Sequence, residues 1–418
     1  MSKFVIQGGY PLKGTIKVAG MKNAATPIIA ATLLIGEECV ISNVPRIKDV
    51  FKMIEIIQGL GGKVEWRGEH ELAINAKDIS PEGINAQAVV AMRSSILLIG
   101  PLLARFKSVR IPEPGGCIIG NRPIDTHLYA LEKFGAKIYR EDKYYSLKAE
   151  NLIGATIILP EFSVTATENT IMAAVLAKGR TIIKLAAAEP HVEDLIKFLN
   201  SCGAKISGAG THTVIIDGVD KLHGATHTII PDQIEAGTFA VAAAVTRGEV
   251  MIENIIPEHL EIILLNLYKA GIKYELGTNW LKVRSDGALR AFRLQILPYP
   301  GFPTDLQAPF GVLATQCTGT SLIQDPLYEG RLGYVQELIK MGANAIVADP
   351  HRVIITGPTP LYGQEIKSFD LRAGATLIIA GLIAEGETII NEAEIVDRGY
   401  ENIEERLSAL GARIKRVE

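Results

Sequence analysis

The chain has 418 residues, with 48% hydrophobic residues, 21% charged residues and a formal net charge of -3 at pH 7. This composition excludes a disordered chain, and the charge balance excludes a general nucleic-acid binder, because no excess of lysine and arginine is available to neutralise phosphates. The length exceeds that of one ordinary core, so we expect two or three domains.

Cysteine and histidine spacing gives no sign of a disulfide framework or a metal site. The cysteines are far apart and form no Cys-x-x-Cys pair; they are Cys39, Cys117, Cys202 and Cys317. Their spacing predicts neither a disulfide framework nor a zinc site. His223 and His227 have the i, i+4 spacing of a metal pair, but they flank a glycine and lack a third ligand. We therefore predict no metal site.

The amino-terminal stretch, MSKFVIQGGYPLKG, contains no basic segment followed by an apolar run, so we expect no signal peptide. The apolar runs at residues 28–35 and 377–383 are far shorter than the roughly 20 residues that a membrane span needs. We therefore expect a cytoplasmic protein that makes no membrane contact.

A glycine turn recurs along the chain with a period of roughly 70 residues, which indicates a repeated structural unit. Its glycines, which are almost evenly spaced, are Gly61, Gly135, Gly203, Gly271, Gly342 and Gly411. Each of them ends an amphipathic segment and precedes an alternating one. This pattern is typical of a helix that is closed by a left-handed glycine and followed by a strand. Clear amphipathic helices are predicted at residues 192–199, 261–269, 335–340 and 402–410.

A second, more apolar helix is predicted earlier in most units. These segments are rich in alanine and lie at residues 24–34, 94–104, 170–177, 236–246 and 373–383. Helices that are apolar all round belong inside a core, whereas the amphipathic ones cover an outer face. Six α/β units predict two similar domains of three units each, with a boundary near residues 222–230. The opening strand, residues 3–7, precedes the first unit, and by symmetry we expect it to pair with the last one.

Polar residues stand at corresponding places in the units. At or near the starts of the apolar helices are Lys22, Asn23, Arg93, residues 167–169, Glu235, Asp305 and Arg372. Before the amphipathic helices are Arg122, Arg331 and Arg398. Helix N-termini favour phosphate and carboxylate groups, and arginine binds both with two parallel hydrogen bonds. A surface ion pair is the alternative for any single arginine, but the recurrence favours a site for a polyanion.

Residues 111–123 depart most strongly from the repeat, because prolines and glycines make this stretch a loop. It contains Cys117, with Arg122 five residues later. A thiol near cationic groups has a lowered pKa and can act as an acid or a nucleophile. The alternative for a lone cysteine is a small buried residue, which we expect for the other three. No Lys-Ser/Thr pair follows Gly120, so this is not a Walker phosphate loop.

The chain resembles the UDP-N-acetylglucosamine enolpyruvyl transferase family (MurA). The resemblance runs from residue 20 to residue 401 through the motifs GMKNAA (20–25), PGGCIIG (114–120), RPIDTH (122–127), PDQIE (231–235), FPTDLQ (302–307), DLR (370–372) and DRGYE (397–401). It implies transfer of the enolpyruvyl group of phosphoenolpyruvate to the 3-hydroxyl of UDP-N-acetylglucosamine, with release of phosphate. This reaction is the first committed step of peptidoglycan precursor synthesis and the target of fosfomycin.

The resemblance also implies an α/β fold of two inside-out barrels, built from six copies of the repeated unit with three in each barrel. One domain would comprise residues 22–229 and the other residues 1–21 with 230–418, with the active site in the cleft between them. We expect a monomer that uses no cofactor.

Roles follow from the resemblance residue by residue. Cys117 would be the general acid that protonates the methylene carbon of phosphoenolpyruvate, and it could also bond to it covalently. Asp305 would accept the proton of the sugar 3-hydroxyl or orient that hydroxyl. Lys22 and Arg398 complete the catalytic set. Phosphoenolpyruvate would contact Lys22, Asn23, Arg122, Arg372 and Arg398. UDP-N-acetylglucosamine would contact Asn23, Arg93, Arg122, Pro123, Ile124, Asp125, Thr126, Ser163, Val164, Asp305, Leu327 and Tyr328, with Arg331 completing the basic lining.

Three positions depart from the family's usual pattern. Glu161 stands where many members have a cation, Gln233 where arginine is common, and Gly330 where asparagine is common. We expect these changes to weaken nucleotide binding. Two alternatives remain open: the related transferase that acts on shikimate 3-phosphate, and a non-catalytic protein that binds UDP-N-acetylglucosamine. The PGGC loop and the RPxD run favour the nucleotide sugar as substrate.

Overall fold

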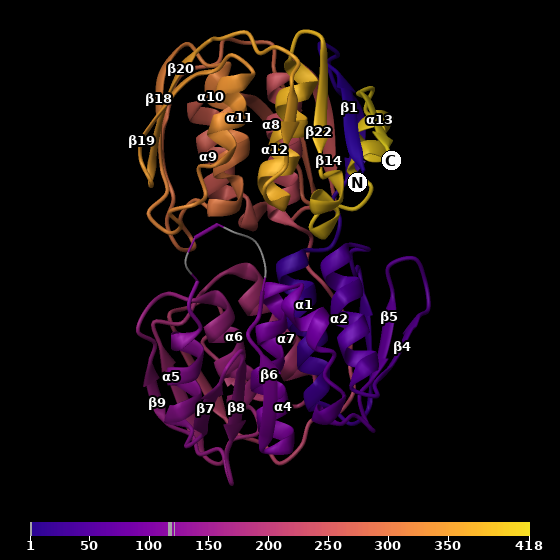
Figure 1. Cartoon of the computed structure of the whole chain (residues 1–418), viewed down its shortest axis with the longest axis vertical. Coiled ribbons are helices and arrows are strands. Elements are labelled where there is room, and N and C mark those ends of the chain that lie inside the picture. The colour runs from indigo at the N-terminus through magenta and orange to yellow at the C-terminus, as the bar shows by residue number, and fades with distance from the viewer. Residues whose placement is uncertain (1, 116–118, 121) are drawn as a thin grey trace. The chain divides into compact units, whose positions relative to one another are not determined.

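The computed structural model describes residues 2–115, 119–120 and 122–418, so Cys117 lies outside the described residues. The chain divides into two compact units (Figure 1). Unit 1 comprises Met1–Ala19, Cys117–Asn121 and Pro231–Glu418, and unit 2 comprises Gly20–Gly116 and Arg122–Ile230. Over the described residues, each unit contains three small sheets arranged with a set of buried helices.

The described part of unit 2 has two four-stranded sheets and one three-stranded sheet, with the orders β13-β3-β5-β4, β11-β12-β10-β9 and β6-β8-β7. The strands are β3 (Glu38–Ser42), β4 (Lys63–Trp66), β5 (Leu72–Asn75), β6 (Ser108–Pro112), β7 (Lys137–Glu141), β8 (Tyr144–Lys148), β9 (Thr156–Ile158), β10 (Arg180–Lys184), β11 (Lys205–Ser207), β12 (Thr213–Asp217) and β13 (Thr226–Thr228). The helices are α1 (Lys22–Ala31), η1 (Thr32–Leu34), α2 (Lys48–Gly59), η2 (Pro81–Gly83), α3 (Ala86–Val90), η3 (Arg93–Leu98), α4 (Ile99–Phe106), α5 (Asp125–Lys133), α6 (Val164–Ala174) and α7 (Pro190–Ser201).

Unit 1, where it is described, has three four-stranded sheets, with the orders β21-β22-β1-β23, β15-β16-β14-β2 and β17-β18-β20-β19. The strands are β1 (Lys3–Gln7), β2 (Lys13–Lys17), β14 (Glu249–Glu253), β15 (Lys273–Leu276), β16 (Trp280–Arg284), β17 (Arg293–Gln295), β18 (Gly319–Gln324), β19 (Asn344–Asp349), β20 (Arg352–Gly357), β21 (Glu365–Lys367), β22 (Glu387–Asn391) and β23 (Arg413–Val417). The helices are α8 (Gln233–Val245), η4 (Pro257–His259), α9 (Glu261–Lys269), η5 (Thr304–Leu306), α10 (Gln307–Thr315), α11 (Tyr334–Lys340), α12 (Leu371–Ile383), η6 (Ala393–Arg398) and α13 (Ile403–Ala409).

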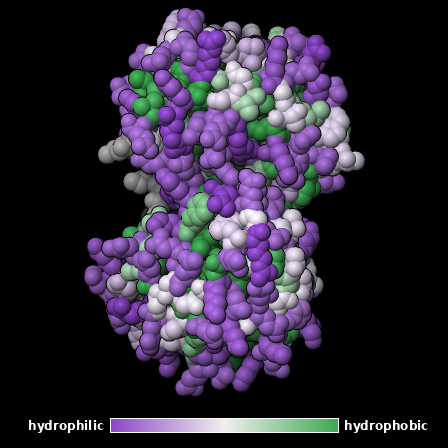
Figure 2. Space-filling model, turned by 90° about the vertical axis from the view of Figure 1, so that its right-hand side faces the viewer, coloured by the Kyte–Doolittle hydropathy of each residue, from purple (hydrophilic) through white to green (hydrophobic). Residues whose placement is uncertain are grey.

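The apolar helices form the centre of unit 1. Every residue of α8 and α10 is buried, and these two helices and α12 contact one another (Figure 1). Their sequences have no polar face, so burial on all sides is the favourable arrangement. Strand β1 pairs antiparallel with both β22 and β23 of the last repeat, as the repeat symmetry predicts. On the face shown in Figure 2, hydrophilic side chains predominate and apolar ones show only in small areas.

The repeated glycines close helices as predicted. The residues Gly61, Gly135, Gly203, Gly271, Gly342 and Gly411 have φ angles between 85° and 103°. Each follows the end of an amphipathic helix by two residues; the helices are α2, α5, α7, α9, α11 and α13. An L-residue other than glycine would be strained at this backbone angle.

The predicted start of α6 was wrong. The expected segment, residues 170–177, lies largely within a helix that begins six residues earlier, at Val164. The Ser163 side chain caps this helix by accepting a hydrogen bond from the Ala166 N–H. Thr167 and Asn169 therefore lie buried in the body of the helix instead of at its start. Elsewhere too, the described residues form no helix with the length and apolar composition that a membrane span requires.

Candidate active site

The candidate residues of unit 2 gather where several helices begin. Arg93 is the first residue of η3, and its guanidinium group donates hydrogen bonds to the carbonyl oxygens of Arg122 and Pro123. These contacts join η3 to Arg122 and Pro123, which lie just before α5. The Thr126 hydroxyl then donates to the Glu161 carboxylate over 2.9 Å, which joins α5 to the segment before α6. The structure thus brings together Arg93, the run from Arg122 to Thr126, and Ser163 with Val164.

Lys22 and Asn23 begin α1 in the same unit. Lys22 forms an ion pair of 2.6 Å with Asp49, and both side chains are almost buried. The ion pair holds the Lys22 side chain at the start of α1, where the helix N–H groups also favour an anionic ligand.

In unit 1, Asp305 lies between two arginines. One carboxylate oxygen contacts Arg331, and the other accepts a hydrogen bond of 3.1 Å from Nε of Arg372. Asp305 belongs to η5, just before α10, whereas Arg331 precedes α11 and Arg372 lies in the first turn of α12. The repeat therefore brings three charged residues from three separate helix starts to one point.

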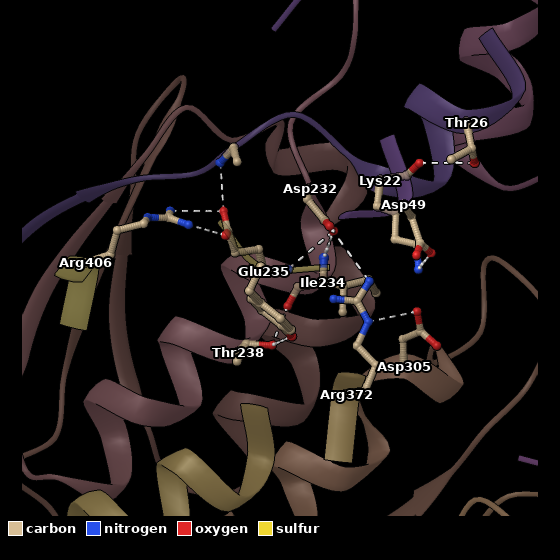
Figure 3. A network of polar contacts seen from close by, with 12 residues as sticks. Lys22, Thr26, Asp49, Asp232, Ile234, Glu235, Thr238, Asp305, Arg372 and Arg406 are labelled. Carbon is tan, nitrogen blue, oxygen red and sulfur yellow. Dashed lines mark hydrogen bonds and ion pairs between the residues drawn. The ribbon is translucent and has the colours of Figure 1, made fainter. Parts of the chain in front are cut away.

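Arg372 also contacts the start of α8. Its guanidinium group lies 3.8 Å from the Asp232 carboxylate (Figure 3). The same group lies 5.2 Å from the centre of the Tyr400 ring. Burial opposes the charge on Arg372, but Tyr400, Asp305 and Asp232 outweigh it and raise its pKa. For Arg331, likewise, burial is outweighed by nearby aspartates, chiefly Asp305, and its pKa is raised. Both arginines thus remain charged.

Asp232 and Tyr400 belong to the motifs named above, but sequence reasoning assigned them no role. Asp232 caps α8 by accepting from the N–H groups of Ile234 and Glu235, a common use of aspartate before a helix. The capping role of Asp232 could have been predicted from the sequence. Its contact with Arg372 could not, because the two residues are far apart in the chain. Glu235 is occupied elsewhere, because its carboxylate accepts from Arg406 and from the Ala19 N–H (Figure 3).

The remaining candidates of unit 1 are Leu327, Tyr328, Arg398 and Cys117. Tyr328 lies with its ring 5.9 Å from the guanidinium carbon of Arg331. Leu327 is held by a hydrogen bond from its N–H to Asp325 and is 40% exposed, so its side chain is available to a ligand. Arg398 is the last residue of η6. The predicted acid, Cys117, lies outside the described residues.

Two of the three unusual positions, Gly330 and Gln233, differ in their surroundings. A Cβ added at Gly330 would lie 2.9 Å from the carbonyl carbon of Ile119, so a larger residue would force the loop backbone away. The Gly330 N–H donates to the Ile119 carbonyl oxygen over 3.1 Å. Gln233 is buried, and within the described part of the chain its Oε1 accepts no hydrogen bond. Gly330 therefore packs closely against Ile119, which is two residues from Cys117 in the sequence. Nothing in the structure explains Gln233.

The two spaced histidines have separate surroundings. His227 Nε2 lies 3.0 Å from the Asp194 carboxylate, and the His223 ring lies against Gly203. Among the residues that the structure describes, no three His, Cys, Asp or Glu side chains are grouped so as to hold a metal ion.

The free energy of unfolding should depend on pH through the Asp232 carboxyl group. Burial raises the pKa of its carboxyl from 3.8 to about 6, although Arg372 opposes the shift. Between these values the native protein keeps a proton that the unfolded chain has released, so stability falls as pH rises through this window. One such group accounts for up to about 3 kcal/mol. Urea unfolding of Asp232→Asn should show a flatter pH dependence than the wild type from pH 4 to 6, and parallel curves would contradict this assignment.

Comparison with known proteins shows the family of this sequence. A family model described as EPSP synthase (3-phosphoshikimate 1-carboxyvinyltransferase) matches residues 6–407. A protein named UDP-N-acetylglucosamine 1-carboxyvinyltransferase from Koribacter versatilis (strain Ellin345) is 46% identical over 420 residues, covering 100% of this chain and 97% of its own. UDP-N-acetylglucosamine 1-carboxyvinyltransferase 3 from Caldanaerobacter subterraneus subsp. tengcongensis is 47% identical over 422 residues and is covered completely.

Solved structures confirm the predicted fold class. The enolpyruvyl transferase NikO from Streptomyces tendae superposes with a TM-score of 0.91 at 24% identity, over 100% of this chain and 99% of its own. EPSP synthase from Acinetobacter baumannii gives a TM-score of 0.77 at 20% identity over 100% of both chains. At such low identity the likeness speaks for the fold alone, which is that of the enolpyruvyl transferases. The sequence matches go further: this chain belongs to the EPSP synthase family and, within it, to the UDP-N-acetylglucosamine 1-carboxyvinyltransferases.

Proposed function

We propose that the protein transfers the enolpyruvyl group of phosphoenolpyruvate to the 3-hydroxyl of UDP-N-acetylglucosamine and releases phosphate. The observation that carries this proposal is the identity of 46% to 47%, over the whole chain, to relatives named for this reaction. The Asp305 carboxylate, fixed by Arg331 and Arg372, supports it because the acceptor hydroxyl must lose a proton.

The proposed chemistry needs one acid, one base and a clamp for phosphate. Cys117 protonates the methylene carbon of phosphoenolpyruvate, which leaves an oxocarbenium-like carbon. The sugar 3-hydroxyl attacks that carbon and gives its proton to Asp305, forming a tetrahedral intermediate. Loss of a methyl proton and of phosphate then restores the alkene. Lys22, Arg122, Arg372 and Arg398 stabilise the phosphate and carboxylate charges, and no step requires a metal or an organic cofactor.

The nucleotide sugar is assigned mainly to unit 2. Arg93, the segment from Arg122 to Thr126, and Ser163 with Val164 would contact the uridine and diphosphate. Asn23, Asp305, Leu327 and Tyr328 would contact the sugar. We assign residues 22–229 and residues 1–21 with 230–418 to the two three-repeat domains. In a cell the reaction would take place in the cytoplasm, by a monomer, as the first committed step of peptidoglycan precursor synthesis.

Calorimetric titration tests the substrate. We expect UDP-N-acetylglucosamine to bind the wild-type protein with one site per chain, and shikimate 3-phosphate to give no heat under the same conditions. Fosfomycin added with the nucleotide sugar should modify Cys117 and none of the other three cysteines, as peptide mass spectrometry can show. Binding of shikimate 3-phosphate alone would overturn the substrate, and an unmodified Cys117 would contradict the role of the thiol.

A further inference from the structure

A buried chain of hydrogen bonds in unit 2 ends at the first turn of α6. Asn169 Oδ1 accepts from the Gly100 N–H over 2.8 Å, and Asn169 Nδ2 donates to the Ile96 carbonyl oxygen over 2.8 Å. The same Nδ2 lies 2.9 Å from His127 Nδ1, and His127 Nε2 lies 3.1 Å from Thr165 Oγ1. The chain therefore connects α4 and η3 to α6 and α5 through two side chains that are at most 3% exposed.

The direction of every bond in this chain is fixed by its backbone partners. The Gly100 N–H can only donate and the Ile96 carbonyl can only accept, so the amide of Asn169 has one possible orientation. Its nitrogen must then donate to His127 Nδ1, which has to be unprotonated. The ring proton of His127 is consequently on Nε2, from which it is donated to Thr165.

A protonated His127 would place an N–H against the N–H of Asn169. The surroundings also disfavour the imidazolium: burial, followed by the charges of Arg93 and Arg122, lowers the pKa of His127 to about 3. The ring is thus neutral, with one tautomer, at any pH near neutrality.

This arrangement decides what the Thr165 hydroxyl can offer. Its oxygen accepts from His127, and among the described residues it makes no second hydrogen bond. The hydroxyl proton of Thr165 is therefore available to an acceptor that is not part of this series of hydrogen bonds, such as a ligand. Val164 and Thr165 are the first two residues of α6, so their N–H groups have no acceptor within the helix. Three donors, with the charges of Arg93 and Arg122 nearby, suit a phosphate group.

We propose that His127 and Asn169 are positioning residues, which fix the Thr165 hydroxyl as a hydrogen-bond donor to a phosphate of the nucleotide sugar. This inference rests on the proposed function, since it specifies how the segment at Ser163 and Val164 holds the diphosphate. His127 touches no substrate and exchanges no proton during the reaction.

Substitution of Thr165 tests the donor. Thr165→Val keeps the shape and removes the hydroxyl, so we expect Kd and KM for UDP-N-acetylglucosamine to rise roughly tenfold, as for one lost hydrogen bond to a charged group. The kcat and the KM for phosphoenolpyruvate should stay within about twofold. Thr165→Ser retains the hydroxyl and should restore nucleotide affinity. Thr165→Val with wild-type nucleotide affinity would overturn the inference.

Two substitutions of His127 separate positioning from packing. In His127→Gln the amide nitrogen can replace Nε2 and still donate to Thr165, whereas in His127→Asn only the position of Nδ1 is replaced. We expect His127→Asn to weaken nucleotide binding to the level of Thr165→Val, His127→Gln to weaken it less, and His127→Asn combined with Thr165→Val to add nothing further. Equal losses in His127→Asn and His127→Gln, or additive losses when His127→Asn is combined with Thr165→Val, would show a merely structural role. Failure of the wild type to bind UDP-N-acetylglucosamine would instead overturn the proposed function, and this inference with it.

Discussion

Replacing Asp305 with asparagine should lower the turnover number by a factor of roughly 10² to 10⁴, the usual contribution of a general base. Asparagine has the same shape, so the loss would come from chemistry. The amide cannot take a proton from the sugar hydroxyl, and its nitrogen cannot accept from Arg331 or Arg372, both of which contact the carboxylate of Asp305. Phosphate release at saturating substrates measures the effect.

Asp217 offers a matched control. Its carboxylate also binds an arginine, accepting 2.7 Å and 2.9 Å hydrogen bonds from Arg180, but the pair is exposed on unit 2. Asp217→Asn should keep wild-type turnover, because an exposed ion pair contributes little. Turnover of Asp305→Asn within threefold of the wild type would contradict the role of Asp305 as the proton acceptor.

Replacing Cys117 with alanine should reduce phosphate release below detection. Without the thiol, no acid remains to protonate the methylene carbon, and protonation creates the electrophile that the sugar attacks. Nucleotide binding should be unchanged, because the expected nucleotide contacts lie on other residues. The two results together, loss of turnover and retained Kd for UDP-N-acetylglucosamine, would separate an acid from a binding residue.

Cys317 is the control for cysteine loss in general. It is buried in unit 1, and its thiol donates to the Leu313 carbonyl oxygen. Cys317→Ala should lower the melting temperature and leave kcat close to that of the wild type. Measurable turnover in Cys117→Ala would contradict the proposed acid and would require another proton donor.

The architecture could be predicted from the sequence because its signals are local. A glycine such as Gly203 marks the end of a helix through its own backbone angle, and α9 was predicted at residues 261–269, where it occurs. The start of α6 was missed because the residues after its cap, Ser163, are largely polar, so the apolar pattern that marked the other helices begins only later in α6.

The candidate site shows the same limit. The motifs contained Asp305 and Arg372, and the repeat pointed to Arg331. No pattern indicated that Arg372 also contacts Asp232, or that Tyr400 lies beside it. The chain of hydrogen bonds through His127 was equally hidden, because it joins α4, α5 and α6, which are separated in sequence. Residue types can be read locally, whereas partners that tertiary packing brings together cannot.

Phosphate release from phosphoenolpyruvate, measured with UDP-N-acetylglucosamine in one reaction and shikimate 3-phosphate in another, tests the central claim most directly. We expect release with the nucleotide sugar and none with shikimate 3-phosphate. Release only with shikimate 3-phosphate would keep the fold and contradict the substrate. Absence of release in both, with the nucleotide sugar still bound, would contradict the proposed reaction and indicate a binding protein.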